Sequence, residues 1–536
     1  MNTEQTIFQD KFFWLALLVG GFFLSLTLWF GFTMDQAVCN YVARAWRDFH
    51  KPPYTGVWDQ SFLGIFLVHR FIITVFGESY LGFRLFDFLV QLGSLAMIFY
   101  LAKKFSGSSV AGFLAGASWG IYYFGLGSLE TGEREGYVLF ILLVSVILGL
   151  NWQAKFWRRA IAAGLLIGFA FQLKPSFLLS WPVFGVWFLA EGFSKRPRLV
   201  WLEMVLFSAA CVAPTASVLF YYWRLGALKE LYLATIWFNF AVYASTSYNA
   251  FPDTPVWKMA LMIIHSNFLQ APVAWFSACV AMLVPYRIAK DTASKKILWV
   301  SLGLVSVGLV SFISQGKFFP YHLTPFFGFL MIFSGAGLNW LGSLLEKSAG
   351  GGKSKFLPAF FYLAVIIFMI SEINPQLMNF ASQYAFGNFD RAYSSGSSFD
   401  KFFYRAAKSL QPALKDEDEI GFFSWNPLLP YLLQKRLPSR FMCLQHLLMR
   451  QRNGELTGQQ RKWIKEYSDD SIRARPRFFL VTDYMPGWDI FNLKSSSFKK
   501  AMAENFPELK EFLEQNYTLR AKMGELEIYE LSRPAP

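Results

Sequence analysis

Asp35 lies three residues beyond the first long apolar run of the chain, residues 12–32. A run of about 20 apolar residues can cross a membrane as a helix, so this carboxylate is expected at the membrane surface. A carboxylate at such a place can take a proton from an attacking hydroxyl or amine. Asp35 is therefore the candidate catalytic base. A solvated interfacial acid or a helix cap is the structural alternative.

A second cluster of charge occurs in the short stretch Glu130-Thr-Gly-Glu133-Arg134-Glu135. Three acids and one arginine in six residues exceed what a polar hairpin between two membrane spans requires. Charged side chains beside membrane spans are costly and are functional candidates by default. The cluster is therefore a candidate site, with a plain hairpin as the alternative.

Isolated cations mark two further span ends. Lys174 precedes Pro175 between two short apolar runs, and Lys317 lies just before Tyr321 and His322 at the start of another. An amine in apolar surroundings keeps its charge only if it reaches water or an anion. We expect these side chains to bind an anion, with snorkelling to the interface as the alternative.

The composition sets the class of protein to which these residues belong. Of 536 residues, 54% are hydrophobic, 19% are aromatic and only 16% are charged. Soluble domains contain about 25% charged residues, so the composition indicates a membrane protein. Run lengths predict about eleven spans. They lie near 12–32, 82–102, 108–127, 136–152, 159–174, 176–193, 199–222, 257–285, 297–315, 322–345 and 356–373.

The net charge of +14 could indicate a nucleic-acid partner, but its distribution does not. Basic residues concentrate in alternate short loops, which is the positive-inside pattern of cytoplasmic loops. These groups are Lys103 with Lys104, Lys155 with Arg158 and Arg159, Lys195 with Arg196 and Arg198, Lys290 with Lys295 and Lys296, and Lys347 with Lys353 and Lys355. The pattern predicts a cytoplasmic N-terminus and an external C-terminus, and it places the charge clusters at outer loops.

Segment 374–536 differs in kind, because its apolar stretches are short and its charge is ordinary. Helical and strand patterns alternate there, which predicts a small α/β domain. The expected helices lie at 399–414, 457–468 and 507–516, and the expected strands at 419–424, 477–482 and 525–531. We therefore expect a membrane domain at 1–373, with an amphipathic outer loop at 33–81, followed by an α/β domain at 374–536.

Several short patches resemble the GT-C superfamily of membrane glycosyltransferases, especially bacterial aminoarabinose transferases, protein O-mannosyltransferases and lipopolysaccharide-core transferases. The patches are Phe32-Thr-Met-Asp35-Gln, Tyr41-Val-Ala-Arg44, Trp58-Asp59-Gln60-Ser61, Gly82-Phe-Arg84-Leu85, Gly164-Leu-Leu-Ile-Gly168 with Lys174-Pro175, and Gln315-Gly-Lys317-Phe-Phe-Pro-Tyr321-His322. The resemblance implies transfer of a hexosyl or pentosyl group, with inversion, from a polyprenyl-phosphate donor. The acceptor would be a lipid-linked glycan, lipopolysaccharide or protein outside a bacterial-type inner membrane.

The resemblance also suggests roles for the charged residues. Asp35 would be the base, and the leaving phosphate would need cations around it. The candidate phosphate-binding residues are Lys174, Lys317, Arg134, His322 and Tyr321. The second acidic site, for sugar hydroxyls or a divalent cation, would be Glu130, Glu133, Glu135 and Asp59. Because the chain has no Cys/His ligand spacing, a cation on Glu133 and Glu135 would be hard, such as Mg²⁺, Mn²⁺ or Ca²⁺.

Two other classes of function remain open at this point. A transporter or flippase of lipid-linked sugars would also carry membrane charges, but at mid-bilayer and in mirrored halves. A glycan-binding or assembly scaffold would place its function in segment 374–536 and make the acids near the spans dispensable.

Overall fold

The computed structural model describes residues 7–152, 155–244, 255, 257–258, 261–262, 272–283, 288–289, 291–315, 319–348, 356–385, 398–451, 453–483 and 493–532. The chain forms two compact units, and each is built from segments that are distant in sequence. Unit 1 comprises Met1–Gly31, Ser79–Val218 and Val256–Ser394. Unit 2 comprises Phe32–Glu78, Leu219–Pro255 and Ser395–Pro536.

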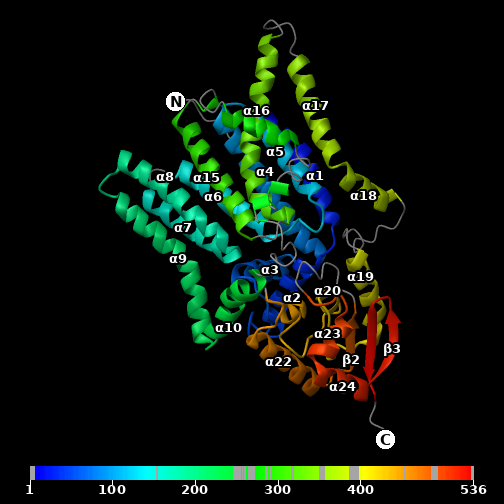
Figure 1. The fold of residues 1–536 in the computed structure, drawn as a ribbon. Helices are drawn as coiled ribbons and strands as arrows, with labels where there is room; N and C mark the ends of the chain where they lie inside the picture. The colour runs from blue at the N-terminus through cyan, green and yellow to red at the C-terminus, as the bar shows by residue number, and fades with distance from the viewer. Residues whose placement is uncertain are drawn as a thin grey trace. The chain divides into compact units, whose positions relative to one another are not determined.

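Unit 1 is made of helices, most of them long (Figure 1). They are α1 (Lys11–Leu26), α4 (Tyr80–Ser106), α5 (Ser109–Gly125), α6 (Arg134–Asn151), α7 (Phe156–Leu173), α8 (Ser180–Lys195), α9 (Val200–Arg224, whose last residues belong to unit 2), α13 (Pro272–Leu283), α15 (Thr292–Gln315), α16 (Thr324–Ser348), α17 (Phe356–Glu372) and α18 (Asn374–Ala385). The 3-10 helices η3 (Pro175–Leu179) and η6 (Pro320–Leu323) precede α8 and α16.

Within the described residues, eight helices are long and apolar enough to cross a membrane. They correspond to eight of the expected spans, at Lys11–Trp29, Tyr80–Ser106, Arg134–Asn151, Phe156–Leu173, Pro175–Lys195, Val200–Arg224, Thr292–Gln315 and Pro320–Ser348. Two further expected spans, 108–127 and 356–373, coincide with the shorter helices α5 and α17, of 17 residues each. Of the expected span 257–285 the structure describes the 12-residue helix α13 and residues 257–258 and 261–262, and the rest lies outside the described residues. The expected helical membrane fold is confirmed, while the orientation of the termini stays a prediction.

Small residues let the helices of unit 1 approach closely, as the glycine spacing predicts. A Cβ atom on Gly120 of α5 would overlap the backbone of Gly20 in α1. A Cβ atom on Gly168 of α7 would likewise overlap the carbonyl oxygen of Cys211 in α9. These contacts fix α5 against α1 and α7 against α9, so the span ends that carry the charged residues are held in place.

Unit 2 combines helices with a small sheet (Figure 1). Its helices include α2 (Met34–Asp48), α3 (Leu63–Val75), α10 (Leu228–Tyr232), α19 (Ser398–Leu410), α20 (Leu428–Leu432), α21 (Gln445–Leu448), α22 (Gly458–Ala474), α23 (Phe498–Asn505) and α24 (Pro507–Asn516). The strands are β1 (Ile420–Phe423), β2 (Phe478–Thr482), β3 (Tyr517–Met523) and β4 (Leu526–Leu531). Among the described residues the sheet order is β1-β2-β4-β3, with β1 parallel to β2 and the other pairs antiparallel.

An aromatic cluster joins the three chain segments of unit 2. The indole of Trp58, from the first segment, lies 5.0 Å from the ring of Phe238 and 5.1 Å from that of Trp463, measured between centroids. The backbone N–H of Trp58 donates to the carbonyl of Arg440 at 2.8 Å. Trp58 is 1% exposed, and burial of so large a side chain stabilises the assembly of segments that are far apart in sequence.

Candidate functional site

Three charged or polar side chains gather at one end of the unit 1 helices. Lys174 follows α7 in an extended conformation, and Pro175 then begins η3. Its amine forms an ion pair with Glu135, which lies in the first turn of α6. The Nε2 atom of His322, in η6, lies 3.6 Å from the same Glu135 oxygen. All three are buried, with exposed fractions of 7%, 0% and 4% for Lys174, Glu135 and His322.

The loop before α6 is tied to η6 by a second contact. The carboxylate of Glu130 accepts a hydrogen bond from the backbone N–H of Tyr321 at 2.9 Å. The Tyr321 ring packs edge-on against His322, with centroids 4.4 Å apart, and lies 5.9 Å from the Lys174 amine. The structure thus places candidate phosphate-binding residues (Lys174, Tyr321 and His322) beside two acids expected in the second acidic site (Glu130 and Glu135), and the roles of all of them stay predictions.

Glu133 and Arg134 complete this end of unit 1. Glu133 is the N-cap residue of α6, and Arg134 is its first residue. The charges of both act on Lys174, with Arg134 repelling it and Glu133 attracting it. The described residues contain no group of three or more His, Cys, Asp or Glu side chains arranged to hold a metal ion. A cation on Glu133 and Glu135 stays a prediction, and Lys317 lies outside the described residues.

Arg84 fixes the loop that carries these acids. Its buried guanidinium donates to the carbonyls of Phe30 at 3.2 Å, Gly31 at 2.8 Å, Ser128 at 3.4 Å and Thr131 at 3.2 Å. It also donates to the Thr131 hydroxyl at 3.1 Å. One side chain thus joins the backbone that ends the first span to the loop before α6. Asp35 follows Gly31 by four residues along the chain.

A second buried contact supports the same loop. The Tyr123 hydroxyl lies 3.0 Å from both carboxylate oxygens of Asp87 and accepts a hydrogen bond from the backbone N–H of Gly132 at 2.8 Å. Gln91 donates to Asp87 at 3.2 Å. Gly132 has a φ angle of +77°, which glycine adopts without strain. The loop conformation therefore depends on a side chain from α5 and on one glycine.

Asp35 lies in unit 2, at the second position of α2. Thr33 and Gln36 form a capping box that starts the helix, with the Gln36 side chain accepting from the Thr33 N–H at 3.2 Å. The side chain of Asp35 is exposed, and the first turn of a helix favours its negative charge. Burial raises the pKa of the Cys443 thiol well above its usual range, and the charges of Asp59 and Asp35 raise it further. Both carboxylates therefore lie close to Cys443.

Asp59 has a structural contact in addition to its expected role. Its side chain accepts a hydrogen bond from the Ser61 N–H at 2.7 Å, which closes a turn next to Trp58. Asp59 is 4% exposed. Asp59 and Asp35 belong to unit 2, whereas Glu130 and the buried cluster belong to unit 1. The second acidic site expected from the sequence is therefore divided between the two units.

Comparison with known proteins agrees with this architecture. Residues 59–223 match the sequence profile described as dolichyl-phosphate-mannose-protein mannosyltransferase. The crystal structure of ArnT from Cupriavidus metallidurans bound to undecaprenyl phosphate is similar over 97% of each chain, with a TM-score of 0.57 and 13% identity. The profile match and the shared fold support assignment of the chain to the GT-C superfamily.

Other comparisons bear on the same assignment. The archaeal oligosaccharyltransferase AglB from Archaeoglobus fulgidus, in complex with an inhibitory peptide and a dolichol-phosphate, is similar over 98% of this chain and 75% of its own. Its TM-score is 0.51 and its identity is 12%. No curated protein sequence matches the chain. The GT-C assignment expected from the sequence patches is confirmed.

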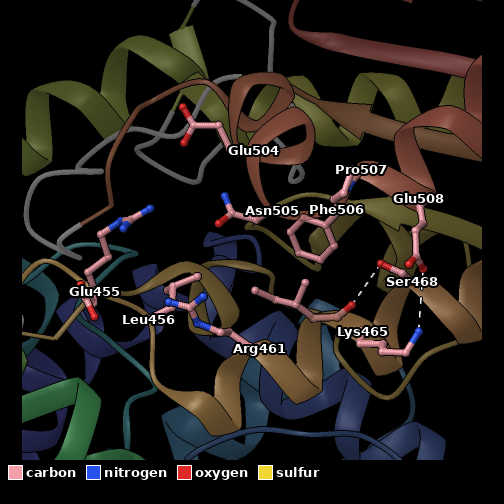
Figure 2. A pocket seen from close by; sticks show the side chains of 12 residues that line it. Glu455, Leu456, Arg461, Lys465, Ser468, Glu504, Asn505, Phe506, Pro507 and Glu508 are labelled. Atoms are coloured by element: carbon pink, nitrogen blue, oxygen red, sulfur yellow. Dashed lines mark hydrogen bonds and ion pairs between the residues drawn. The ribbon is translucent and has the colours of Figure 1, made fainter.

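The GT-C chain also has a surface cleft of about 470 Å³ in unit 2 (Figure 2). Arg461 and Lys465 of α22 lie on one side and Glu504 and Glu508 on the other, and the buried ring of Phe506 lies between them. The Lys465 amine is 3.8 Å from the Glu508 carboxylate. Because acidic and basic side chains surround it, the cleft suits a polar ligand of low net charge better than a polyanion.

Sequence reasoning missed Arg84, Asp87 and Tyr123 as positioning residues of the GT-C chain. A signal for two of them was present, because Arg84 and Asp87 are charged residues within the span Tyr80–Ser106. Charges inside spans are rare and usually have a partner. That rule selects Arg84 and Asp87, but it cannot identify the backbone carbonyls that Arg84 binds. Tyr123 carries no comparable signal.

Proposed function

We propose that this GT-C chain transfers a sugar from a polyprenyl-phosphate donor to an acceptor on the outer side of the membrane, with inversion at the sugar. The acceptor would be a lipid-linked glycan, lipopolysaccharide or protein. Support comes from the superfamily, and from two structural relatives whose structures contain undecaprenyl phosphate and a dolichol-phosphate. The basic loops support an inner-membrane protein with an external C-terminus.

The observation that carries the proposal is the buried cluster of Lys174, Glu135 and His322 at one end of the spans. The leaving group in this reaction is a phosphate, whose developing charge needs cations held in place. Glu135 holds the buried Lys174 amine in an ion pair, and His322 adds a second nitrogen. An incoming phosphate would share Lys174 with Glu135, and Arg134 would supply further positive charge.

Asp35 supplies the other half of the reaction in this proposal. An acceptor hydroxyl becomes a good nucleophile when a base takes its proton as it attacks. Asp35 is exposed, so an acceptor can reach it, and the α2 N-terminus stabilises its charged form. Inversion requires attack from the face opposite the phosphate, so the base and the cations act on opposite faces of the sugar.

A transporter or flippase of lipid-linked sugars is the alternative. It predicts polar residues at mid-bilayer on broken helices of mirrored halves. The cluster around Lys174 instead lies where α7 ends, α6 begins and η6 precedes α16. Clustering at helix ends favours chemistry on a headgroup over its passage across the membrane.

The decisive experiment compares Asp35→Asn with Asp48→Asn in the purified full-length protein. Asp48 ends the same helix and pairs with Arg47, so its substitution controls for changes in α2. Transfer from a polyprenyl-phosphate sugar should fall about 10²–10⁴-fold in Asp35→Asn and change little in Asp48→Asn. Donor binding should be retained by both variants. More than about half of wild-type turnover in Asp35→Asn would exclude Asp35 as the base.

Mass spectrometry can identify the sugar. A strain lacking the protein should accumulate its lipid-linked donor, and the mass of the accumulated lipid gives the sugar and the polyprenyl length. A strain with an unchanged lipid-linked sugar pool would contradict transfer from such a donor.

A further inference from the structure

A largely apolar groove lies between α8 and α15 of unit 1, with a volume of about 790 Å³. Val186 of α8 and Trp299 of α15 line it, and they are 66% and 65% exposed. The groove closes where the two helices pack tightly, because a Cβ on Gly303 would lie 2.7 Å from Val183. Its volume is in the range of ligand sites, about 300–1,000 Å³.

Lysines surround the other end of the groove. The carboxylate of Glu191, which is 5% exposed, accepts from Lys195 at 2.8 Å and from Lys296 at 3.1 Å. Its second oxygen accepts from the buried Arg159 at 2.8 Å. Glu191 therefore holds two flexible lysine amines at fixed places beside the groove. An ammonium has three donors, so the Lys296 amine can bind an anion in addition to Glu191.

The charge at this end is not balanced. Arg159 also forms an ion pair with Glu203, so two buried carboxylates face Arg159, Lys195 and Lys296. Lys295 is a further cation in the groove lining. It is exposed and forms no ion pair with a described residue. The groove is thus apolar along most of its length and has an excess of positive charge at one end.

We propose that this groove is a binding site for an anionic phospholipid of the bilayer. Lys195, Lys295 and Lys296 bind the phosphate, and an acyl chain lies along Val186 and Trp299 toward Gly303. Eight residues of α15 separate Lys295 from Gly303, which corresponds to about 12 Å of trough. Basic pockets between membrane helices at the cytoplasmic side recognise anionic lipid headgroups in this way.

The proposed lipid site is distinct from the site around Lys174. Lys174 lies just before the 3-10 turn that leads into α8, whereas Lys195 is the last residue of that helix. The 16 residues of α8 span about 24 Å. A phospholipid in the groove therefore cannot be the sugar donor held at Lys174. Its role would be to hold α8 against α15.

The test measures lipid binding by native mass spectrometry of the purified full-length protein in detergent. Phosphatidylglycerol and phosphatidylcholine are added separately to wild type, Lys295→Gln, Val186→Trp and the control Lys347→Gln. Lys347 is an exposed lysine in the last turn of α16 and does not line the groove. In Val186→Trp, the larger side chain occupies the apolar part of the groove where the acyl chain would lie.

Wild type should bind phosphatidylglycerol more tightly than phosphatidylcholine. Lys295→Gln should weaken phosphatidylglycerol binding about five-fold, which is about 1 kcal/mol. Val186→Trp should weaken both lipids, and Lys347→Gln should weaken neither. The proposal would be contradicted if wild type bound the two lipids equally, or if Lys347→Gln lost as much phosphatidylglycerol binding as Lys295→Gln. The groove would then be ordinary lipid-facing surface. Displacement of phosphatidylglycerol by polyprenyl phosphate would also overturn the proposal, because the donor lipid would then be the occupant.

Discussion

Replacing Arg84 by lysine tests whether one side chain fixes the end of the first span and the loop before α6 within unit 1. The substitution keeps the positive charge but removes the planar guanidinium that reaches four backbone carbonyls. Two of these carbonyls, of Phe30 and Gly31, precede Asp35. The other two, of Ser128 and Thr131, precede Glu133. Arg84 is fully buried, so no water from bulk solvent replaces its contacts.

The size of the effect follows from the contacts. A hydrogen bond from a charged donor contributes about 1.5–3 kcal/mol. A lysine ammonium occupies a single point and cannot reach all the oxygens around the guanidinium, so at least two bonds are lost. The expected destabilisation is about 3–6 kcal/mol, a large part of the total stability of about 5–15 kcal/mol. Turnover should fall at least about ten-fold, because a displacement of 1 Å can cost about 10²-fold.

The assay combines thermal unfolding in detergent with turnover of a polyprenyl-phosphate sugar. Arg158→Lys is the control, because Arg158 is an exposed arginine in the first turn of α7. We expect a lower unfolding temperature and lower turnover for Arg84→Lys and neither for Arg158→Lys. Wild-type turnover together with an unchanged unfolding temperature in Arg84→Lys would refute the argument that the guanidinium fixes these segments.

Three further predictions use other parts of the chain. Lys174→Met and Lys317→Met should each weaken donor binding by about 1.5–3 kcal/mol, the value of a charge-assisted hydrogen bond, with little change in acceptor binding; donor binding as tight as wild type would mean that the lysines only snorkel. A periplasmic alkaline phosphatase fused after Pro536 should be active, and an inactive fusion with an active cytoplasmic reporter there would reverse the proposed orientation. Burial lowers the pKa of His446 below its usual range, although the charge of Asp59 acts in the opposite direction. The unfolded chain therefore binds the proton more readily, so the stability due to neutral His446 is complete above about pH 6.5 and is lost as the pH falls. His446→Phe should flatten the decrease in unfolding temperature between about pH 7 and pH 5, and an equally steep decrease would exclude this histidine as its cause.

Much of the fold could be predicted from local patterns. Long apolar runs predicted the membrane-spanning helices, because a helix needs about 20 apolar residues to cross a bilayer. In segment 374–536, the expected strands correspond to β1, β2 and β4, whose residues are mostly buried. The expected helices correspond to α19, α22 and α24. Strand β3 was missed because it is mostly exposed and carries Arg520 and Lys522, so it lacks the apolar pattern of a buried strand.

The two-unit organisation could not be predicted in the same way. Hydropathy is read along the chain, whereas unit 2 is assembled from segments separated by long stretches of unit 1. The domain boundary expected between residues 373 and 374 stays a prediction. For the site, sequence position indicated which charges lie at span ends. It could not show that Glu135 pairs with Lys174, or that Arg84 binds four carbonyls, because both depend on how separate helices pack.

The composition of unit 2 has a consequence for how the protein is made. The guanidinium of Arg440 donates to the carbonyl of Tyr54 at 2.9 Å, across 386 residues of chain. At a synthesis rate of about 5–20 residues per second, the first segment waits roughly 20–80 s for this partner. Phe238 is synthesised partway through that interval, whereas Phe441 and Trp463 follow Arg440, so the indole of Trp58 stays partly uncovered until the last segment is made. A premature stop codon before the last segment would therefore leave a permanently exposed aromatic surface beside the membrane, which is the feature that quality-control proteases and chaperones recognise.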